Sequence, residues 1–215
     1  MTFYDRHEAG ENLASALLKY KNNKNTIILG LPRGGVVVAF EVAKALELPF
    51  DIMVTRKIGA PMNHELAIGA TDELGHTVLN QEIIKSLEVS EEYLKEEKQK
   101  EQKIAEQRLA HYRGNKPPLS LKGKVALLID DGLATGATML AAIHSAKAKK
   151  AKKIVVAVPV APAETIEKMR READDVVCLH IPIFFGAVGA FYQLFDQTTD
   201  EEVMELLEKK CHSSA

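Results

Sequence analysis

The chain has 215 residues, of which 46% are hydrophobic, and a formal net charge of −2. This length and apolar content suit one α/β domain with an insertion, and the small charge provides no global field to attract nucleic acid or a membrane surface. Cys178 and Cys211 lack metal-binding or redox spacing, the N-terminus lacks an apolar signal core, and no apolar run approaches the roughly 18 residues of a membrane helix. These features predict a cytoplasmic protein.

The first quarter of the chain predicts a strand–helix–strand unit. Apolar residues on one face predict a helix over about residues 6–22, and residues 26–29 predict a short buried strand. A loop over residues 31–35, a helix over residues 36–47 and a strand over residues 50–55 follow. This order predicts a parallel sheet with right-handed crossovers.

Residues 57–76 are harder to assign. They contain Gly59 and Gly69 and lack continuous apolar periodicity, which predicts a mobile loop able to close over a site. Residues 66–71 and 76–79 also have the composition of two short strands that could pair with each other.

A helical insertion is predicted at about residues 80–118. Ser90 has the character of an N-cap, and the charged helix that follows, over residues 91–113, is predicted to face solvent or a partner. Glu96 and Lys100 are predicted to form an i,i+4 ion pair on it.

The second half alternates strands and helices, and a capping box at Thr199 opens the last helix. The predicted strands are residues 124–129, 154–158 and 176–180, and the predicted helices are residues 136–149, 162–173 and 200–209. The sequence therefore predicts an α/β fold, a doubly wound parallel sheet of about five strands flanked by helices, as a single domain over residues 1–215. Ligands of such sheets bind outside the carboxyl ends of the strands.

The segment after the strand at residues 124–129 carries the most specific pattern. Asp130 and Asp131 end this strand, and a loop of small and hydroxylated residues leads directly into a helix. Small residues let the backbone approach an anion, and the free amides of a helix N-terminus bind one. The loop is therefore predicted to bind a phosphate, and the two carboxylates suit a vicinal diol, Mg²⁺ or both. The predicted phosphate-binding residues are Ala134, Thr135, Gly136, Ala137 and Thr138.

This pattern resembles the signature with which type I phosphoribosyltransferases bind 5-phosphoribosyl 1-pyrophosphate (PRPP). The resemblance implies the type I fold with a small hood, and a Mg²⁺-dependent transfer of 5-phosphoribosyl from PRPP to a nitrogenous base with release of pyrophosphate. It implies that Asp130 and Asp131 are catalytic. They would hold the ribose hydroxyls, stabilise the positive sugar and bind Mg²⁺, directly or through ribose hydroxyls or water.

Two basic segments at other strand ends resemble pyrophosphate sites. Arg33, Gly34 and Gly35 resemble the pyrophosphate loop of type I enzymes. Arg56 and Lys57 resemble the pair that contacts pyrophosphate in orotate phosphoribosyltransferases, which implies catalytic and pyrophosphate-binding roles for both. The alternatives are an ordinary Pro-Gly turn with a solvated arginine, and an exposed basic pair at a strand end.

The resemblance extends across the chain to a group of bacterial phosphoribosyltransferase-like proteins with a helical insertion and an unassigned acceptor. It rests on residues 4–6, 30–35, 56–61 and 65–69. The mobile loop departs from that of the orotate enzymes, which carries a further lysine and a histidine. In this chain Gly59 and Ala60 stand in the region of that lysine, and His64 is displaced from the position of that histidine.

Aromatic residues cluster in a predicted C-terminal cap at about residues 181–199, where Tyr192 and Phe185 are predicted to bind the base. A hydrophobic cap on the core is the alternative. A PRPP- or nucleotide-sensing regulator without turnover is the rival function, and a phosphohydrolase is a third, although it would leave the phosphate loop unexplained. The basic run over residues 147–153 fits a solvated helix end better than a nucleic-acid site. The oligomeric state stays open, with a homodimer among the alternatives.

Overall fold

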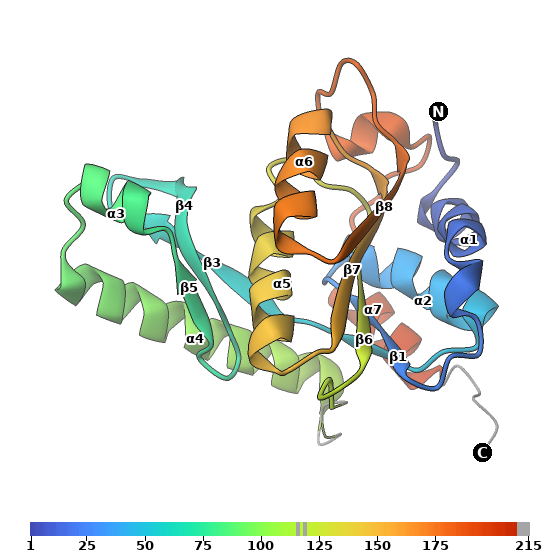
Figure 1. The fold of residues 1–215 in the computed structure, drawn as a ribbon, viewed down its shortest axis with the longest axis horizontal. Helices are drawn as coiled ribbons and strands as arrows, with labels where there is room; N and C mark the ends of the chain where they lie inside the picture. Colours follow the sequence, from blue (N-terminus) through green and yellow to red (C-terminus); the bar gives the residue numbers. More distant parts are fainter. Residues whose placement is uncertain (115–116, 118–119, 210–215) are drawn as a thin grey trace.

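The computed structural model describes residues 1–114, 117 and 120–209, which form a five-stranded sheet and a separate three-stranded sheet (Figure 1). All strand pairs of the larger sheet are parallel, in the order β2-β1-β6-β7-β8. The doubly wound α/β prediction is therefore confirmed. The strands are β1 (Thr26–Gly30), β2 (Phe50–Ile52), β6 (Val125–Ile129), β7 (Lys153–Val160) and β8 (Asp175–His180).

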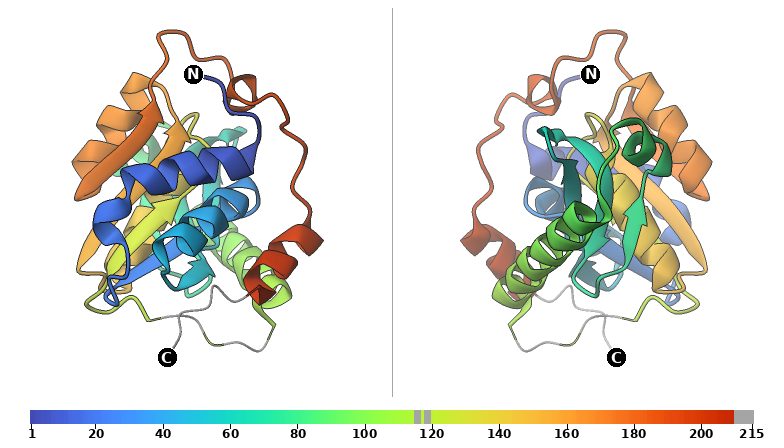
Figure 2. Two further views of the ribbon diagram at one scale, coloured as in Figure 1. Left: turned by 90° about the vertical axis from the view of Figure 1, so that its right-hand side faces the viewer. Right: turned by 90° about the vertical axis from the view of Figure 1, so that its left-hand side faces the viewer.

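Helices cover both faces of the parallel sheet because each face of its strands is apolar. On one face lie α1 (Arg6–Ala16) and α2 (Gly34–Leu46), whose Leu13 and Val42 belong to one core cluster (Figure 2, left). On the other lie α5 (Ala137–Ala148) and α6 (Ala163–Glu172). The predicted first helix ends earlier than expected, and a short 3-10 turn, η1 (Leu18–Tyr20), follows it.

The second sheet corrects two predictions. The strand predicted at residues 50–55 is two strands, because β2 ends at Ile52 and β3 (Thr55–Ala60) belongs to the other sheet. The segment predicted as a mobile loop is β3, β4 (Asn63–Asp72) and the turn into β5 (Thr77–Leu79). The suggested pairing of the last two strands is confirmed, since β4 and β5 are antiparallel neighbours.

The insertion covers this antiparallel sheet. Apolar side chains of β3 and β4, such as Ile58 and Ile68, pack against α3 (Gln81–Ser86) and the start of α4 (Glu91–Arg113). Figure 2 (right) shows α4 crossing the sheet. Ser90 caps α4 as predicted, through a hydrogen bond from the Tyr93 amide.

The predicted ion pair on α4 is wrong. Lys100 pairs with Glu97, at 2.9 Å between Nζ and Oε1, rather than with Glu96. Glu97 lies on the buried side of α4, whereas Glu96 is exposed. Gly114 ends the helix, and the remainder of the predicted insertion, to about residue 118, lies mostly outside the described residues.

A buried carboxylate fastens the antiparallel sheet to the parallel one. Asp72, at the end of β4, is 0% exposed, and it accepts hydrogen bonds from Ser145 Oγ of α5 at 2.5 Å and from His76 at 2.9 Å. Lys149 Nζ lies 3.5 Å from the same carboxylate. We call these four residues the Asp72 latch.

The end of the chain returns over the parallel sheet. Residues 181–199 include a short 3-10 turn, η2 (Val188–Phe191), and the predicted capping box then starts α7 (Asp200–Glu208). Phe3 pairs with Tyr192 in a parallel bridge, so the N-terminal residues hold this segment. Within the described ranges, no helix has the length and apolar composition that crossing a membrane requires.

Candidate active site

The acidic pair and the Arg33–Gly35 loop meet at the carboxyl edge of the parallel sheet. Asp130 and Asp131 follow β6, and Gly34 and Gly35 begin α2, after the neighbouring strand β1. A Cβ on Gly34 would collide with Asp131 Oδ2, and one on Gly35 would lie 2.7 Å from Asp130 Oδ1. Only glycines allow this approach, which brings two of the predicted subsites into contact.

Arg6 is a residue of this edge to which the sequence analysis gave no separate role. Its Nε lies 2.7 Å from Asp131 Oδ2, and its Nη1 donates to the Asp196 carbonyl oxygen at 2.7 Å. Its guanidinium stands 3.9 Å from the centre of the Phe195 ring. Because the side chain is only 12% exposed, Arg6 is a fixed link between α1, the acidic pair and the C-terminal segment.

Burial governs the ionisation of the acidic pair. Burial and then the charge of Asp131 raise the pKa of Asp130 well above its usual range. Burial also raises the pKa of Asp131, although hydrogen bonding and charge attraction from Arg6 oppose this. A cation bound between the two carboxylates would favour the ionised form of both.

The predicted phosphate loop leads into α5. Gly136 is the N-cap of this helix, with φ of +73°, and it offers no side chain to the first-turn amides. The side chains of Thr135 and Thr138, in the same loop, are exposed. The loop also packs on α6, where Thr165 Oγ1 donates to the Ala134 carbonyl oxygen at 2.6 Å. Amides at such a helix start can bind an anion.

Two of the predicted pyrophosphate cations, Arg33 and Arg56, have carboxylate partners in this structure. Arg33 Nη1 lies 3.8 Å from Asp200 Oδ1 at the start of α7. Arg56 Nε lies 2.7 Å from Glu101 Oε2 of α4. Arg56 and Lys57 are part of β3, within the antiparallel sheet, rather than directly after a parallel strand. The hydroxyl of Thr55, the first residue of β3, nevertheless donates to the Thr138 carbonyl oxygen at 3.3 Å, in the predicted phosphate loop.

The two predicted base-binding aromatics have packing roles. Tyr192 is 6% exposed, and its hydroxyl donates to the Asp131 carbonyl oxygen at 2.5 Å. Burial, then the charge of Asp131, raises the pKa of this hydroxyl. Phe185 stacks on Phe191 with ring centres 5.5 Å apart. The polar group of Tyr192 is thus committed to holding the acidic segment in place.

The donor set fits a hard divalent cation that is shared with a substrate. Among the residues that the structure places, no three His, Cys, Asp or Glu side chains gather as a metal site. Mg²⁺ commonly binds through one or two carboxylates together with substrate phosphates and water. Asp130 and Asp131 supply such a pair at the edge where the glycine loop and the phosphate loop also lie.

Comparisons with known proteins identify a family and several relatives of this chain. A family model described as a phosphoribosyl transferase domain matches residues 3–195. Proteins of two Mycobacterium tuberculosis strains, provisionally named phosphoribosyl transferases, are 42% identical over 207 residues, which is 96% of this chain. The chain covers 46% of the length of each. The crystal structure of TT1426 from Thermus thermophilus matches with a TM-score of 0.87 and 42% identity, covering 96% of this chain and 98% of that one.

Proposed function

Because the chain belongs to the phosphoribosyl transferase family, we propose that it transfers 5-phosphoribosyl from PRPP to a nitrogenous base. In this reaction the bond between ribose C1 and the pyrophosphate oxygen breaks, a bond from C1 to the base nitrogen forms, and pyrophosphate leaves. The observation that carries the proposal is the contact of Gly34 and Gly35 with Asp130 and Asp131, at the edge where the loop capped by Gly136 begins α5.

Each part of the site has a role in this proposal. Backbone amides and hydroxyls of the loop at residues 134–138 hold the 5'-phosphate, which uses remote binding energy to position C1. Asp130 and Asp131 accept hydrogen bonds from the ribose hydroxyls and stabilise positive charge on the sugar. A bound Mg²⁺, held by the same two carboxylates and substrate oxygens, would neutralise charge on the pyrophosphate.

Cations supplied by the chain itself complete the pyrophosphate subsite. Arg33, Arg56 and Lys57 are proposed to contact the leaving pyrophosphate, which requires Arg33 and Arg56 to exchange their carboxylate partners for it. Tyr192 positions the Asp131 backbone, and Phe185 lies in the cap proposed to receive the base. We also propose that the protein is cytoplasmic and that its reaction belongs to nucleotide metabolism.

Pyrophosphate release tests the reaction. Purified protein is incubated with PRPP, Mg²⁺ and a panel of purine and pyrimidine bases, and pyrophosphate is followed by a coupled assay. Release that depends on one base, and that the Asp130→Asn/Asp131→Asn variant lacks, supports the proposal. Base-independent release in that variant at the wild-type rate would contradict it.

A PRPP-sensing regulator is the second candidate. The observation that favours it is that Asp131, Arg33 and Arg56 each have an ion-pair partner within the chain. In that case calorimetry detects PRPP binding while no base in the panel yields pyrophosphate.

A further inference from the structure

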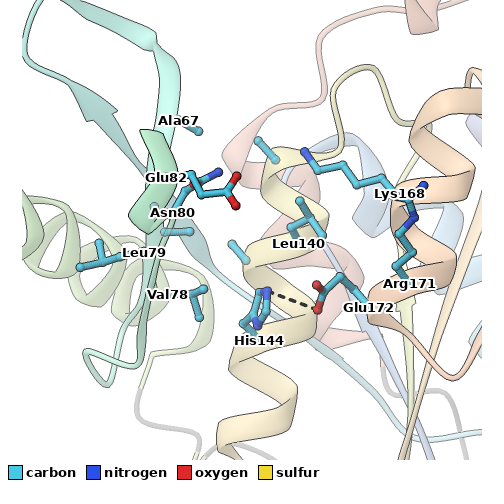
Figure 3. A pocket seen from close by; sticks show the side chains of 14 residues that line it. Ala67, Val78, Leu79, Asn80, Glu82, Leu140, His144, Lys168, Arg171 and Glu172 are labelled. Atoms are coloured by element: carbon cyan, nitrogen blue, oxygen red, sulfur yellow. Dashed lines mark ion pairs between the residues drawn. The ribbon is translucent and has the colours of Figure 1, made fainter. Parts of the chain in front are cut away.

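A cleft of about 590 Å³ lies between the antiparallel sheet and helices α5 and α6 (Figure 3). Neither Asp130 nor Asp131 lines it, and it meets the proposed phosphate loop only at Ala137. Pockets of roughly 300–1,000 Å³ are typical of small-molecule sites. The cleft is therefore large enough for a ligand of its own, on the outer side of α5.

Small apolar side chains form much of the lining. Helix α5 contributes Ala137, Leu140, Ala141 and His144, whose spacing of three, four and seven residues places them on one stripe of the helix. Across from this stripe, β4 and β5 contribute Ala67, Ala70 and Val78 among others. Two such walls, lined mainly by small and aliphatic side chains, suit a flat ring.

The charged groups of the cleft are asymmetric. Lys168 and Arg171 lie on the same side of α6, one turn apart, and neither has an ion-pair partner within 4.0 Å in the part of the chain that the structure describes. Glu172 of the same wall is already paired with Lys147 at 2.9 Å and lies 3.7 Å from His144. Two cations are therefore left to attract an anion.

The opposite wall carries a carboxylate. In Figure 3 Glu82 of α3 and Lys168 of α6 point into the cleft from opposite sides. An anionic group and a hydrogen-bond donor on one ligand, separated by an apolar body, would match this arrangement. A polyanion would not match this arrangement, because Glu82 would repel the rest of its negatively charged chain.

We propose that this cleft is a second binding site and that its ligand is a nucleoside monophosphate. The phosphate pairs with Lys168 and Arg171, the base lies between the apolar walls, and an exocyclic amine of the base donates to Glu82. Since Ala137 both lines the cleft and begins α5, occupancy adjoins the loop at residues 134–138. The proposal does not depend on turnover at the acidic pair.

The absence of tryptophan from the chain makes a direct test simple. A single reporter, Val78→Trp, is placed in the cleft wall, and its fluorescence is titrated with AMP, with ribose 5-phosphate and with adenosine. We expect a saturable change with AMP, and affinities at least tenfold weaker for adenosine, which lacks the phosphate, and for ribose 5-phosphate, which lacks the base.

Charge variants identify the cations. Lys168→Ala/Arg171→Ala in the reporter chain should weaken AMP binding about tenfold or more, because a tenfold change corresponds to about 1.4 kcal/mol and one charge-assisted hydrogen bond contributes about that much. The control, Lys152→Ala/Arg170→Ala, removes the same charge from exposed residues outside the cleft lining and should bind AMP as the reporter chain does.

The introduced tryptophan could itself block the cleft. AMP binding by the same charge variants is therefore also measured by calorimetry without the Val78→Trp reporter. Loss of one class of AMP sites in Lys168→Ala/Arg171→Ala alone supports the proposal. Equal AMP binding by that variant, the control and the natural chain would overturn it. The pyrophosphate assay is scored separately, so the second site and the proposed reaction can each fail without the other.

Discussion

At the scale of single residues, burial sets the properties of the acidic pair. Asp130 carries a raised pKa because burial and the neighbouring carboxylate disfavour its charge. A carboxyl group of this kind stabilises the fold below its unfolded pKa, and that contribution is lost as the pH rises through the folded pKa. At neutral pH the ionised form of Asp130 therefore costs stability, which is a common property of residues retained for function.

The first prediction follows from this cost. Asp130→Asn should abolish PRPP-dependent turnover and raise the melting temperature at pH 7 by a few degrees, since about 1 kcal/mol corresponds to roughly 2–4 °C in a chain of this size. Well below the unfolded pKa of 3.8 the variant and the natural protein should melt alike, because Asp130 is then protonated in both states. A lower melting temperature for Asp130→Asn at pH 7 would show that the carboxylate stabilises the fold.

The second prediction concerns Arg6, which holds Asp131, the Asp196 carbonyl and the Phe195 ring together. Arg6→Ala leaves the largely buried carboxylate of Asp131 unpaired and should cost about 3 kcal/mol of unfolding free energy. Arg6→Lys keeps the charge but not the fork of donors, so it should restore stability in part and kcat/KM less.

Lys19→Ala is the matched control for Arg6. Lys19 also lies near the N-terminus and pairs with an aspartate, Asp175, at 2.9 Å, but its side chain is well exposed. The expected loss is only about 0–1 kcal/mol, with unchanged turnover. Denaturant unfolding and steady-state kinetics measure both effects, and equal losses in the two variants would remove the special role of Arg6.

At the scale of elements, the start of α5 is the proposed phosphate loop and also a contact with α6. A side chain at Gly136 would meet Met169 Cε at 2.8 Å and Thr165 Cγ2 at 2.9 Å, and φ is +73° there. Gly136→Val would therefore strain the helix junction as well as intrude on the proposed anion site, so it is a poor probe of the ligand alone.

The third prediction uses the exposed hydroxyls of this loop instead. Thr135→Val/Thr138→Val keeps the branched shape of both side chains and removes two donors. We expect ribose 5-phosphate affinity at the loop to fall about tenfold or more, since each hydrogen bond to a charged group contributes about 1.5–3 kcal/mol, with little change in melting temperature. Calorimetric titration makes the measurement, and unchanged affinity would place the phosphate elsewhere.

The fourth prediction concerns the Asp72 latch. Burial alone would raise the pKa of Asp72, yet hydrogen bonds from Ser145 and His76 and the charge of Lys149 lower it below 3.8. The latch therefore stabilises the fold above the unfolded pKa of 3.8, and this contribution is lost as the pH falls through the lower folded value. Asp72→Asn should lose about 1–3 kcal/mol at pH 7 and show less acid sensitivity.

Unfolding free energies of the natural protein and Asp72→Asn between pH 2 and pH 7 check the latch. Thr77→Val provides a control nearby, because it removes a half-buried hydroxyl of β5 that bonds only within the β4–β5 region. Parallel pH profiles for the natural protein and Asp72→Asn would contradict the proposed contribution of the carboxylate.

At the scale of the whole molecule, the sequence predicts the parallel sheet well and the antiparallel sheet poorly. The strands β1, β6 and β7 are short apolar runs between clear helix and turn signals, so their order and direction follow from local pattern. The strands β3 and β4 contain glycines and charged residues, and their apolar face is completed by α3 and α4. Their structure depends on packing that no local window contains.

The candidate site divides in the same way. Asp130, Asp131 and the glycines of α2 could be predicted because strand ends of a parallel sheet share one edge. Arg6 lies 125 positions before Asp131 in the sequence, and no spacing rule connects them. The polar hydroxyl of Tyr192 favoured the prediction of a base-binding role. In the structure it donates to the Asp131 carbonyl oxygen, and this contact forms only because the C-terminal segment folds back to the acidic pair.

The fifth prediction joins the two ends of the chain. Phe3 is fully buried, donates its amide to the Phe191 carbonyl at 2.8 Å and accepts from the Gln193 amide at 2.9 Å. Phe3→Ala should therefore increase hydrogen exchange at residues 191–194 while the amides of β6 stay protected. Tyr4→Ala, an exposed neighbour whose backbone bond is kept, serves as the control. Equal exchange in all three proteins would show that the cap is held without the N-terminal residues.

This pairing has a practical consequence for anyone who purifies the protein. Residues 3 and 4 lie alongside the segment that supplies Tyr192, and Arg6 touches Asp131. An affinity tag fused ahead of Met1 would begin within a few residues of the proposed catalytic edge. Activity screens should therefore use protein from which such a tag has been cleaved, because a negative result with the fusion would report on the tag.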